Sequence, residues 1–242
     1  MVFRRVFYAL AGLLVANVSV LWAGDSASFV NLGFSADGSV YMFAQYGVSS
    51  DTLRPWADVF VVDVDRNDFV PGGAVSYTHN RPIVAGQNGS AAMHALIARN
   101  APLAERHGVT FPNQGQPLYI GMARYPRPGI TARERDNANE PVEFRDFAAG
   151  ISYVATLVET IEGTAANPRS SFSINLRSVD QRGETRTLTV GSPNVWRSGI
   201  SQYRIRRVLV SPLGDSLVFV IEMRQVAGNT HNIRYMVETV RL

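Results

Sequence analysis

"FSADGSVYMFAQYG", residues 34–47, is the stretch that decides the fold. It contains Ala36-Asp37-Gly38-Ser39, a tight turn in which glycine supplies the positive φ that such turns need. The residues after the turn are rich in aromatic and β-branched side chains, which favour strands. The stretch therefore predicts a β-hairpin.

An imperfect copy of this stretch lies near the other end of the chain, in "VSPLGDSLVFVIE", residues 210–222. Aligned without gaps, the two copies share the pattern S-x-x-G-x-x-x-x-F, so Gly214 corresponds to Gly38 and Phe219 to Phe43. We interpret the pattern as a rule for building hairpins. Both glycines are expected in turns, and both phenylalanines are expected to face a hydrophobic core.

The same pattern, in which turn-forming residues separate short segments that favour strands, continues through most of the chain. It predicts three antiparallel meanders, at residues 29–77, 150–191 and 203–242. The fold class is therefore mainly β, built from antiparallel four-stranded meanders in a single domain that spans residues 24–242.

A helical insert, at about residues 89–108, separates the first meander from the second. Ser90 is expected as its N-cap, Pro102 is expected to end or kink the helix, and Gly108 is expected to stop the short segment after Pro102.

The opening stretch together with "ADVFVVDVD", residues 57–65, resembles the repeat of TolB-like β-propellers. In that repeat one blade consists of a strand, an S-P-D-G-type turn, a strand that ends in Ala-Phe and a strand that ends in Asp. The resemblance implies hairpin geometry and no particular function, because blades serve many purposes. The two copies lie 176 residues apart, or four periods of 44, but the intermediate positions lack the S-x-x-G pattern. An irregular propeller of few blades and a β-sandwich with the helix packed on it therefore both stay open.

Taken over its whole length, the chain also resembles a family of predicted secreted bacterial proteins of unknown function. The matching segments are the "FVNLGFS-x-DG" opening, the "Y-x-x-F-x-QYG" strand, the "VVDV-x-x-N" strand end and the helical insert. This resemblance implies export and brings no activity and no catalytic residues.

Residues 1–23 have the layout of a secretory signal peptide. Arg4 and Arg5 precede an apolar run, and Ala23 precedes polar residues, which predicts cleavage after Ala23 and a periplasmic or secreted protein. An uncleaved membrane anchor is the alternative. The absence of cysteine from the sequence excludes disulfides, thiolate metal sites and lipid attachment through cysteine.

The charge balance argues against nucleic-acid binding. All 23 basic residues are arginine, and the 21 outside the signal peptide face 20 acidic residues, a net charge of +1. No basic field is therefore expected that could attract a polyanion. The local cluster of Arg204, Arg206 and Arg207 is expected to be a solvated strand face.

The segment "DVDRND" places the oxygen-bearing side chains of Asp63, Asp65 and Asn67 at alternate positions, as in a calcium loop. The glycine expected at the sixth position is Asp68, and the glutamate expected at the twelfth is Ala74. We expect a polar turn at a strand end and no metal, with calcium as the alternative.

The candidate ligand-binding residues are His79, Asn80 and Arg81, which form a polar cluster in a loop directly after a strand, where sites tend to lie. Tyr46, at a strand end, is the strand aromatic best placed to line a groove for a sugar or a peptide. Neither a nucleophile motif of the type G-x-S-x-G nor a phosphate loop is present in the sequence, so no cofactor is expected.

These observations favour an exported, non-enzymatic binding protein of the cell envelope whose partner is another envelope protein or a glycan. One alternative is a periplasmic hydrolase, which requires acid–base residues from among Asp58, Asp63, His79 and Asp146 to converge in one cleft. The other is a structural component of an envelope assembly.

Overall fold

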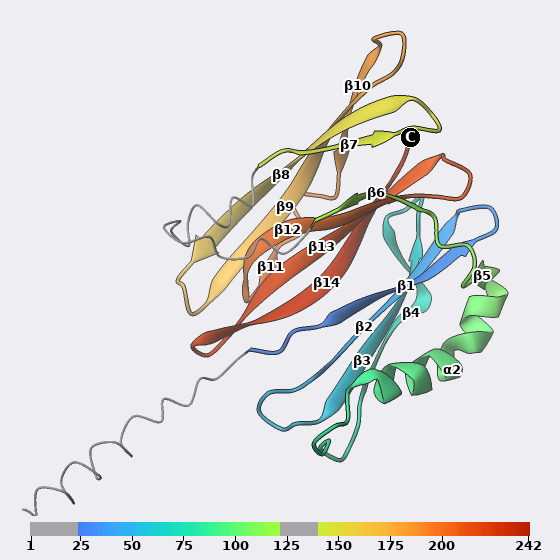
Figure 1. Ribbon diagram of the computed structural model, residues 1–242. Helices are drawn as coiled ribbons and strands as arrows, with labels where there is room; N and C mark the ends of the chain where they lie inside the picture. The colour runs from blue at the N-terminus through green and yellow to red at the C-terminus, as the bar shows by residue number, and fades with distance from the viewer. Residues whose placement is uncertain (1–23, 122–139) are drawn as a thin grey trace, which may run out of the picture.

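The computed structural model describes residues 24–121 and 140–242 (Figure 1). The predicted signal peptide and almost all of the charged loop that precedes the second meander lie outside the described residues. Within them, the chain is mainly β, with antiparallel sheets and one helix. The three predicted meanders are confirmed, each in a separate sheet.

The first sheet contains the first meander and a short additional strand, in the order β4-β3-β2-β1-β5. Its strands are β1 (Ser28–Ser35), β2 (Val40–Val48), β3 (Pro55–Asp63), β4 (Asp68–Thr78) and β5 (Val109–Thr110).

The second sheet contains the second meander in the order β10-β9-β8-β7, and a short strand, β11, also pairs with β9. Its strands are β7 (Val142–Asp146), β8 (Ile151–Gly163), β9 (Pro168–Val179), β10 (Thr185–Val190) and β11 (Arg197–Ser198).

The central sheet contains the third meander, and β6 joins it from an earlier part of the chain, in the order β14-β13-β12-β6. Its strands are β6 (Gln116–Ile120), β12 (Ile200–Val210), β13 (Ser216–Ala227) and β14 (Thr230–Arg241).

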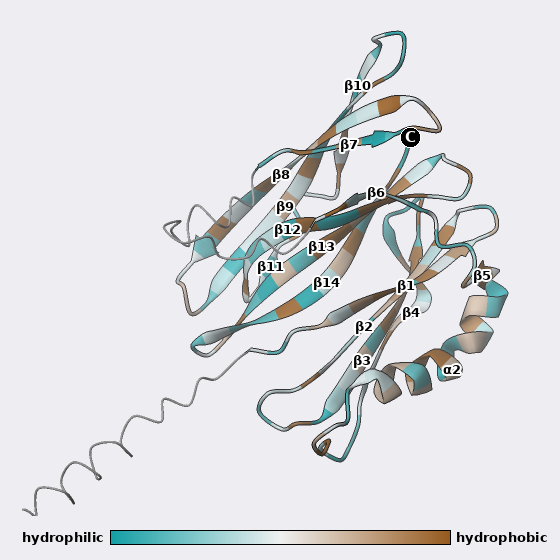
Figure 2. Ribbon diagram, viewed as in Figure 1, coloured by the Kyte–Doolittle hydropathy of each residue, from teal (hydrophilic) through white to brown (hydrophobic). Residues whose placement is uncertain are grey.

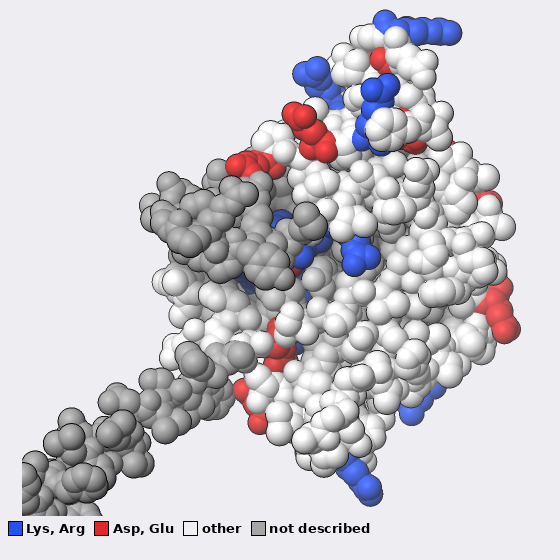
Figure 3. Space-filling model, viewed as in Figure 1, with Lys and Arg blue, Asp and Glu red and all other residues white. Residues whose placement is uncertain are grey.

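The central sheet is covered on both faces, as β13 illustrates. Leu217, Phe219 and Ile221 pack into a hydrophobic cluster with residues of the second sheet. The alternate residues Val218 and Val220 pack into another cluster with residues of the first sheet. The uninterrupted apolar run Leu217–Ile221 is the sequence that such a position requires, because both faces of this part of the strand are removed from water (Figure 2). By contrast, charged side chains of both signs are visible on the outer surface of the molecule in Figure 3.

The helix α2 (Ser90–Arg106) packs on the other face of the first sheet, where it buries Ala92, Met93 and Leu96. The N-cap is Gly89, so the expectation that Ser90 is the N-cap is wrong; Ser90 is the first helical residue, and its backbone N–H donates to Oδ1 of Asn88. Pro102 does not end the helix, which continues to Arg106. Pro102 lies on the exposed side, where water can solvate the carbonyl that proline leaves without a partner.

The two copies of the S-x-x-G pattern form equivalent turns. Gly38 has a φ of 68° and donates its N–H to the carbonyl of Ser35, and Gly214 has a φ of 74° and donates to the carbonyl of Ser211. The turns also touch, because a Cβ on Gly38 would lie 3.4 Å from the Cβ of Ser211. The sequence repeat therefore places two hairpin turns side by side at one end of the first and central sheets.

Both phenylalanines of the repeat are buried, as predicted. They lie in different clusters: Phe43 packs between the first and central sheets, and Phe219 packs between the central and second sheets. The repeat therefore specifies a shape, and each copy contributes that shape to a different interface.

Replacing Gly38 by alanine is expected to lower the free energy of unfolding by about 1 kcal/mol, because an L-residue is strained at this positive φ. Space is not the cause, since the nearest atom to the new Cβ is 3.4 Å away. Urea unfolding of the mature chain measures the loss. Gly38→Asn, which tolerates a positive φ, should recover most of it, and an alanine variant as stable as the wild type would contradict the explanation.

The arginine cluster of β12 is half-buried, and the expectation of a solvated face is wrong. Arg206 lies at a register shift of the strand, and its Nε is 3.1 Å from Oε2 of the partly buried Glu222. The guanidinium of Arg207 lies over the ring of Phe29, 5.4 Å from its centroid. The space between the first and central sheets accounts for this burial, which the pattern of a single strand does not reveal.

Candidate functional site

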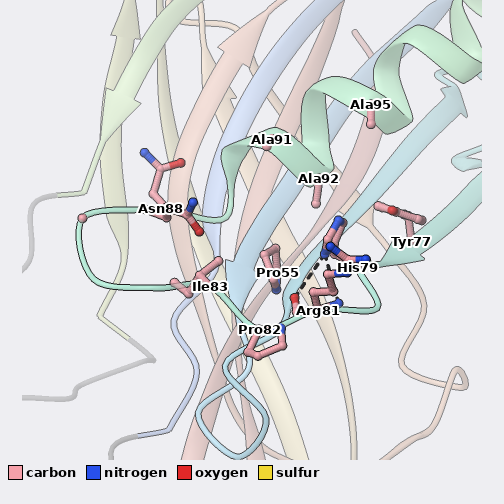
Figure 4. A pocket seen from close by; sticks show the side chains of 12 residues that line it. Pro55, Tyr77, His79, Arg81, Pro82, Ile83, Asn88, Ala91, Ala92 and Ala95 are labelled. Atoms are coloured by element: carbon pink, nitrogen blue, oxygen red, sulfur yellow. Dashed lines mark hydrogen bonds between the residues drawn. The ribbon is translucent and has the colours of Figure 1, made fainter.

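A cavity of about 640 Å³ opens between the loop of residues 79–88 and the first turns of α2 (Figure 4). We call it the loop–helix cavity. Its lining comes from the end of β4, the loop, the start of β3 and the helix, and consists of Pro55, Tyr77, His79, Arg81, Pro82, Ile83, Gly86, Gln87, Asn88, Ala91, Ala92 and Ala95. Two of the predicted ligand-binding residues, His79 and Arg81, are therefore in one concave site.

His79 is held in place by its backbone and by one ring nitrogen. Its N–H donates to the carbonyl of Pro55 at 2.8 Å. Its Nδ1 lies 3.1 Å from both the N–H and the carbonyl oxygen of Arg81. Since the backbone of Arg81 occupies Nδ1, Nε2 is the ring nitrogen that is left to bind a ligand.

The loop is folded against the start of β3 and against itself. Ile83 donates its N–H to the carbonyl of Leu53 at 2.8 Å, and Val84 donates to Oε1 of Gln87 at 3.2 Å. Such bonds satisfy backbone groups that would otherwise need water, so the loop wall of the cavity is formed before any ligand arrives.

The helix supplies the opposite wall with small side chains. Ala91, Ala92 and Ala95 face the cavity in Figure 4. Alanine leaves room that a longer side chain would fill, and together with Pro82 and Ile83 it makes much of the lining apolar.

The formal charge of the cavity comes from Arg81. None of the described residues that line it is acidic, and the side chain of Arg81 belongs to an exposed residue. The aromatic ring of Tyr77 already contacts two other side chains. The guanidinium of Arg99 lies 4.7 Å from its centroid, and the ring of His79 packs against it edge to face. The site therefore suits a ligand that combines an apolar part with an anionic group.

The other two predicted binding residues lie elsewhere. Asn80 is exposed and does not line the loop–helix cavity. Tyr46 is half-buried and packs against the hydrophobic cluster between the first sheet and α2. No sequence signal pointed to Pro55 or to the three alanines, because only the packing of α2 on the first sheet brings them to the loop.

The calcium candidate forms a turn whose oxygens accept or pair with groups of the protein. Oδ1 of Asp63 accepts the N–H groups of Asp65 and Arg66, and Oδ1 of Asp65 lies 2.6 Å from Nε of Arg241. Oδ1 of Asn67 accepts the N–H of Thr239 at 2.6 Å. The turn thus joins the first sheet to β14.

Among the residues that the structure describes, no group of three or more histidine, cysteine, aspartate or glutamate side chains could hold a metal ion. We therefore expect EDTA to leave the melting temperature of the mature chain unchanged, since the oxygens of the turn are engaged by the protein itself. Differential scanning calorimetry measures this, and calcium-dependent melting would instead establish the alternative site.

The four residues of the hydrolase hypothesis are distributed over different places. Oδ2 of Asp58 accepts the side-chain N–H of Gln45 at 3.0 Å, whereas Asp146 lies in the second sheet. His79 lines the loop–helix cavity, and Asp146 lines a separate cavity of about 540 Å³. These two cavities contain no pair of the residues that acid–base chemistry would need.

Comparison with models of protein families identifies the family of this chain. A family model described as a predicted secreted protein (DUF2259) matches residues 42–241. The chain belongs to this family. The DUF2259 match agrees with the expected periplasmic or secreted location and brings no known function. A comparison with curated protein sequences found no match.

The described residues of this DUF2259 protein contain no helix that is both long and apolar enough to cross a membrane.

Proposed function

We propose that this DUF2259 protein is a non-enzymatic binding protein of the cell envelope, and that it binds a short segment of another envelope protein in the loop–helix cavity. The observation that carries the proposal is the position of His79 and Arg81 beside a largely apolar wall, in a cavity with no acidic lining residue among those described. A segment with an apolar side chain and a carboxylate, either a side chain or a chain end, complements this lining.

A protein segment is favoured over a glycan by the state of Tyr77. Sugar rings stack on free aromatic faces, and the ring of Tyr77 is covered by Arg99 on one side and approached by His79. Binding is favoured over hydrolysis by the separation of His79 and Asp146 into different cavities.

We also infer that the sheets form a layered, sandwich-like stack in preference to an irregular propeller. The support is the position of the central sheet, which packs on the first sheet with one face and on the second sheet with the other. In a closed ring of three blades the first and second sheets would also pack on each other, whereas none of the hydrophobic clusters of the described residues joins them.

The proposal is tested by capture from an envelope extract on the immobilised mature chain, residues 24–242. We expect one discrete protein to be retained by the wild type and lost with Arg81→Glu, which reverses the charge of the cavity. Arg182→Glu is the matched control, because Arg182 is also exposed but lies in the turn before β10.

Equal capture by all three proteins would contradict the proposed site, and retention of a glycan in place of a protein would contradict the proposed partner. A parallel screen with ester, glycoside and peptide substrates covers the hydrolase. Turnover that His79→Ala abolishes without loss of fold would overturn a binding-only role.

The proposal includes removal of the signal peptide. We expect N-terminal sequencing of the exported protein to begin at Gly24, because Ala23 ends the predicted cleavage site. An exported form that begins at Met1 would contradict cleavage and support the anchor.

A further inference from the structure

A second concave site lies where turns of the central and second sheets meet the segment that connects β5 to β6. The turn of residues 211–215 joins β12 to β13, the turn of residues 147–150 joins β7 to β8, and the segment 112–116 leads into β6. Together these three segments line most of the cavity of about 540 Å³, which we call the three-turn cavity. In Figure 1 the two turns lie at the same end of the molecule, with the segment before β6 passing beside them.

Asp146 is the single charged residue among the thirteen described residues that line the three-turn cavity. Asp146 is buried, with 3% of its surface exposed to solvent. Its Oδ1 accepts the N–H groups of Ala148 and Ala149, at 2.9 and 3.0 Å, which fixes the orientation of the carboxylate. Both bonds are made by the same oxygen, so they fix one edge of the carboxylate against the turn.

The lining of the cavity is mixed, with polar residues such as Asn113 and Gln114, and large apolar residues lie in or next to it along the chain. Leu213 lines the cavity and is 62% exposed, Phe147 lies between two lining residues and is 81% exposed, and Phe111 precedes the lining residue Pro112 and is 65% exposed. Large apolar side chains grouped at one exposed place are typical of a surface that binds a partner.

The exposed ring of Phe147 is held in position from one side. The guanidinium of Arg145 lies over it, 5.5 Å from the ring centroid. An aromatic side chain that is ordered in the free protein loses little entropy on binding, as is expected of an anchor at an interface.

We infer that the three-turn cavity binds a basic, apolar peptide segment of a partner protein, with an arginine or lysine of the partner at Asp146 and its apolar neighbours on Leu213, Phe147 and Phe111. The charge selects this partner, because the carboxylate of Asp146 is the sole formal charge of the described lining and attracts a cation. The volume admits a few side chains. The inference is independent of the loop–helix cavity, whose lining has the opposite charge.

A peptide array tests this inference on the mature chain. The probes are immobilised pentapeptides with a central arginine and varied neighbours, and the same set with a central glutamine, which is neutral. We expect the labelled wild type to prefer central arginine flanked by apolar residues, by about tenfold over central glutamine.

Asp146→Asn separates the two roles of this residue, because asparagine keeps an Oδ1 acceptor for the turn and removes the charge. The preference for arginine is expected to disappear in this variant and to weaken in Leu213→Ser, whose side chain is exposed and tolerates the change. The matched control is Asp180→Asn, because Oδ1 of Asp180 also accepts two N–H groups of a turn in the second sheet but does not line the cavity.

The inference is overturned if the wild type shows no preference for central arginine. It is also overturned if Asp146→Asn or Leu213→Ser binds as the wild type does. A loss of binding in Asp180→Asn equal to that in Asp146→Asn would assign the effect to the fold of the second sheet and would likewise overturn it.

Discussion

Replacing Phe219 by alanine is expected to lower the free energy of unfolding by about 4 kcal/mol, a large fraction of the stability of a domain this size. The ring has no exposed surface and packs edge to face on Phe144, with 6.4 Å between centroids. Phe219 lies on β13, which is covered by sheets on both sides, so the structure cannot collapse easily into the space that alanine leaves.

Urea unfolding monitored by tryptophan fluorescence measures this loss. Phe147→Ala is the matched control, because it removes the same side chain from a position that is 81% exposed. The control is expected to change stability by less than about 0.5 kcal/mol. Similar losses in the two variants would contradict the double-sided burial of the central sheet.

Replacing Arg197 by methionine is expected to cost about 3 kcal/mol at pH 8, because it leaves a buried carboxylate without its cation. Glu238 on β14 is 5% exposed, and its Oε1 lies 3.4 Å from an Nη of Arg197. Its other oxygen accepts a hydrogen bond from the side chain of Asn67. The guanidinium of Arg197 also lies over the ring of Phe172, 5.0 Å from its centroid, where the thioether of methionine can make a sulfur–aromatic contact in its place.

The loss in Arg197→Met should depend on pH. Burial raises the pKa of Glu238 above its usual value, and the bonds to Asn67 and Arg197 oppose this rise. A carboxyl whose folded pKa is raised contributes stability that is full below its unfolded pKa and is lost as the pH rises through the folded pKa. Removing Arg197 raises the folded pKa further, so the deficit should be larger at pH 8 than at pH 5.

Urea unfolding at both pH values measures this difference. The double variant Arg197→Met, Glu238→Gln should recover most of the stability and lose the added pH dependence, because no buried charge remains. A deficit that is the same at both pH values, or a double variant no more stable than Arg197→Met, would contradict the role of the buried pair.

The strands could be predicted because their signals are local. Alternation, β-branched residues and turn glycines such as Gly38 and Gly214 lie within a few positions of the structure that they determine. The spatial order of the sheets could not be predicted, because it depends on which faces pack together. The apolar run of β13 is compatible with burial on both faces, but it does not name the two partners.

The candidate site was predictable to the same limited extent. His79 and Arg81 stand out because they are polar residues directly after a strand, and the structure places both in a cavity. The other wall comes from Ala91, Ala92 and Ala95, residues with no chemical signal, which reach the loop only through the packing of α2. Tyr46 stood out for its aromatic ring, and the helix half-covers it.

The central claim, that the loop–helix cavity binds a partner, is tested most directly by photo-crosslinking in the intact envelope. The photoreactive residue p-benzoylphenylalanine replaces Ala95, which lines the cavity, or Ala98, which is exposed on the same helix outside it. We expect a single crosslinked protein from position 95 that is absent from position 98 and disappears when Arg81→Glu is added. The same crosslinks from both positions, or a product that Arg81→Glu leaves unchanged, would contradict the claim.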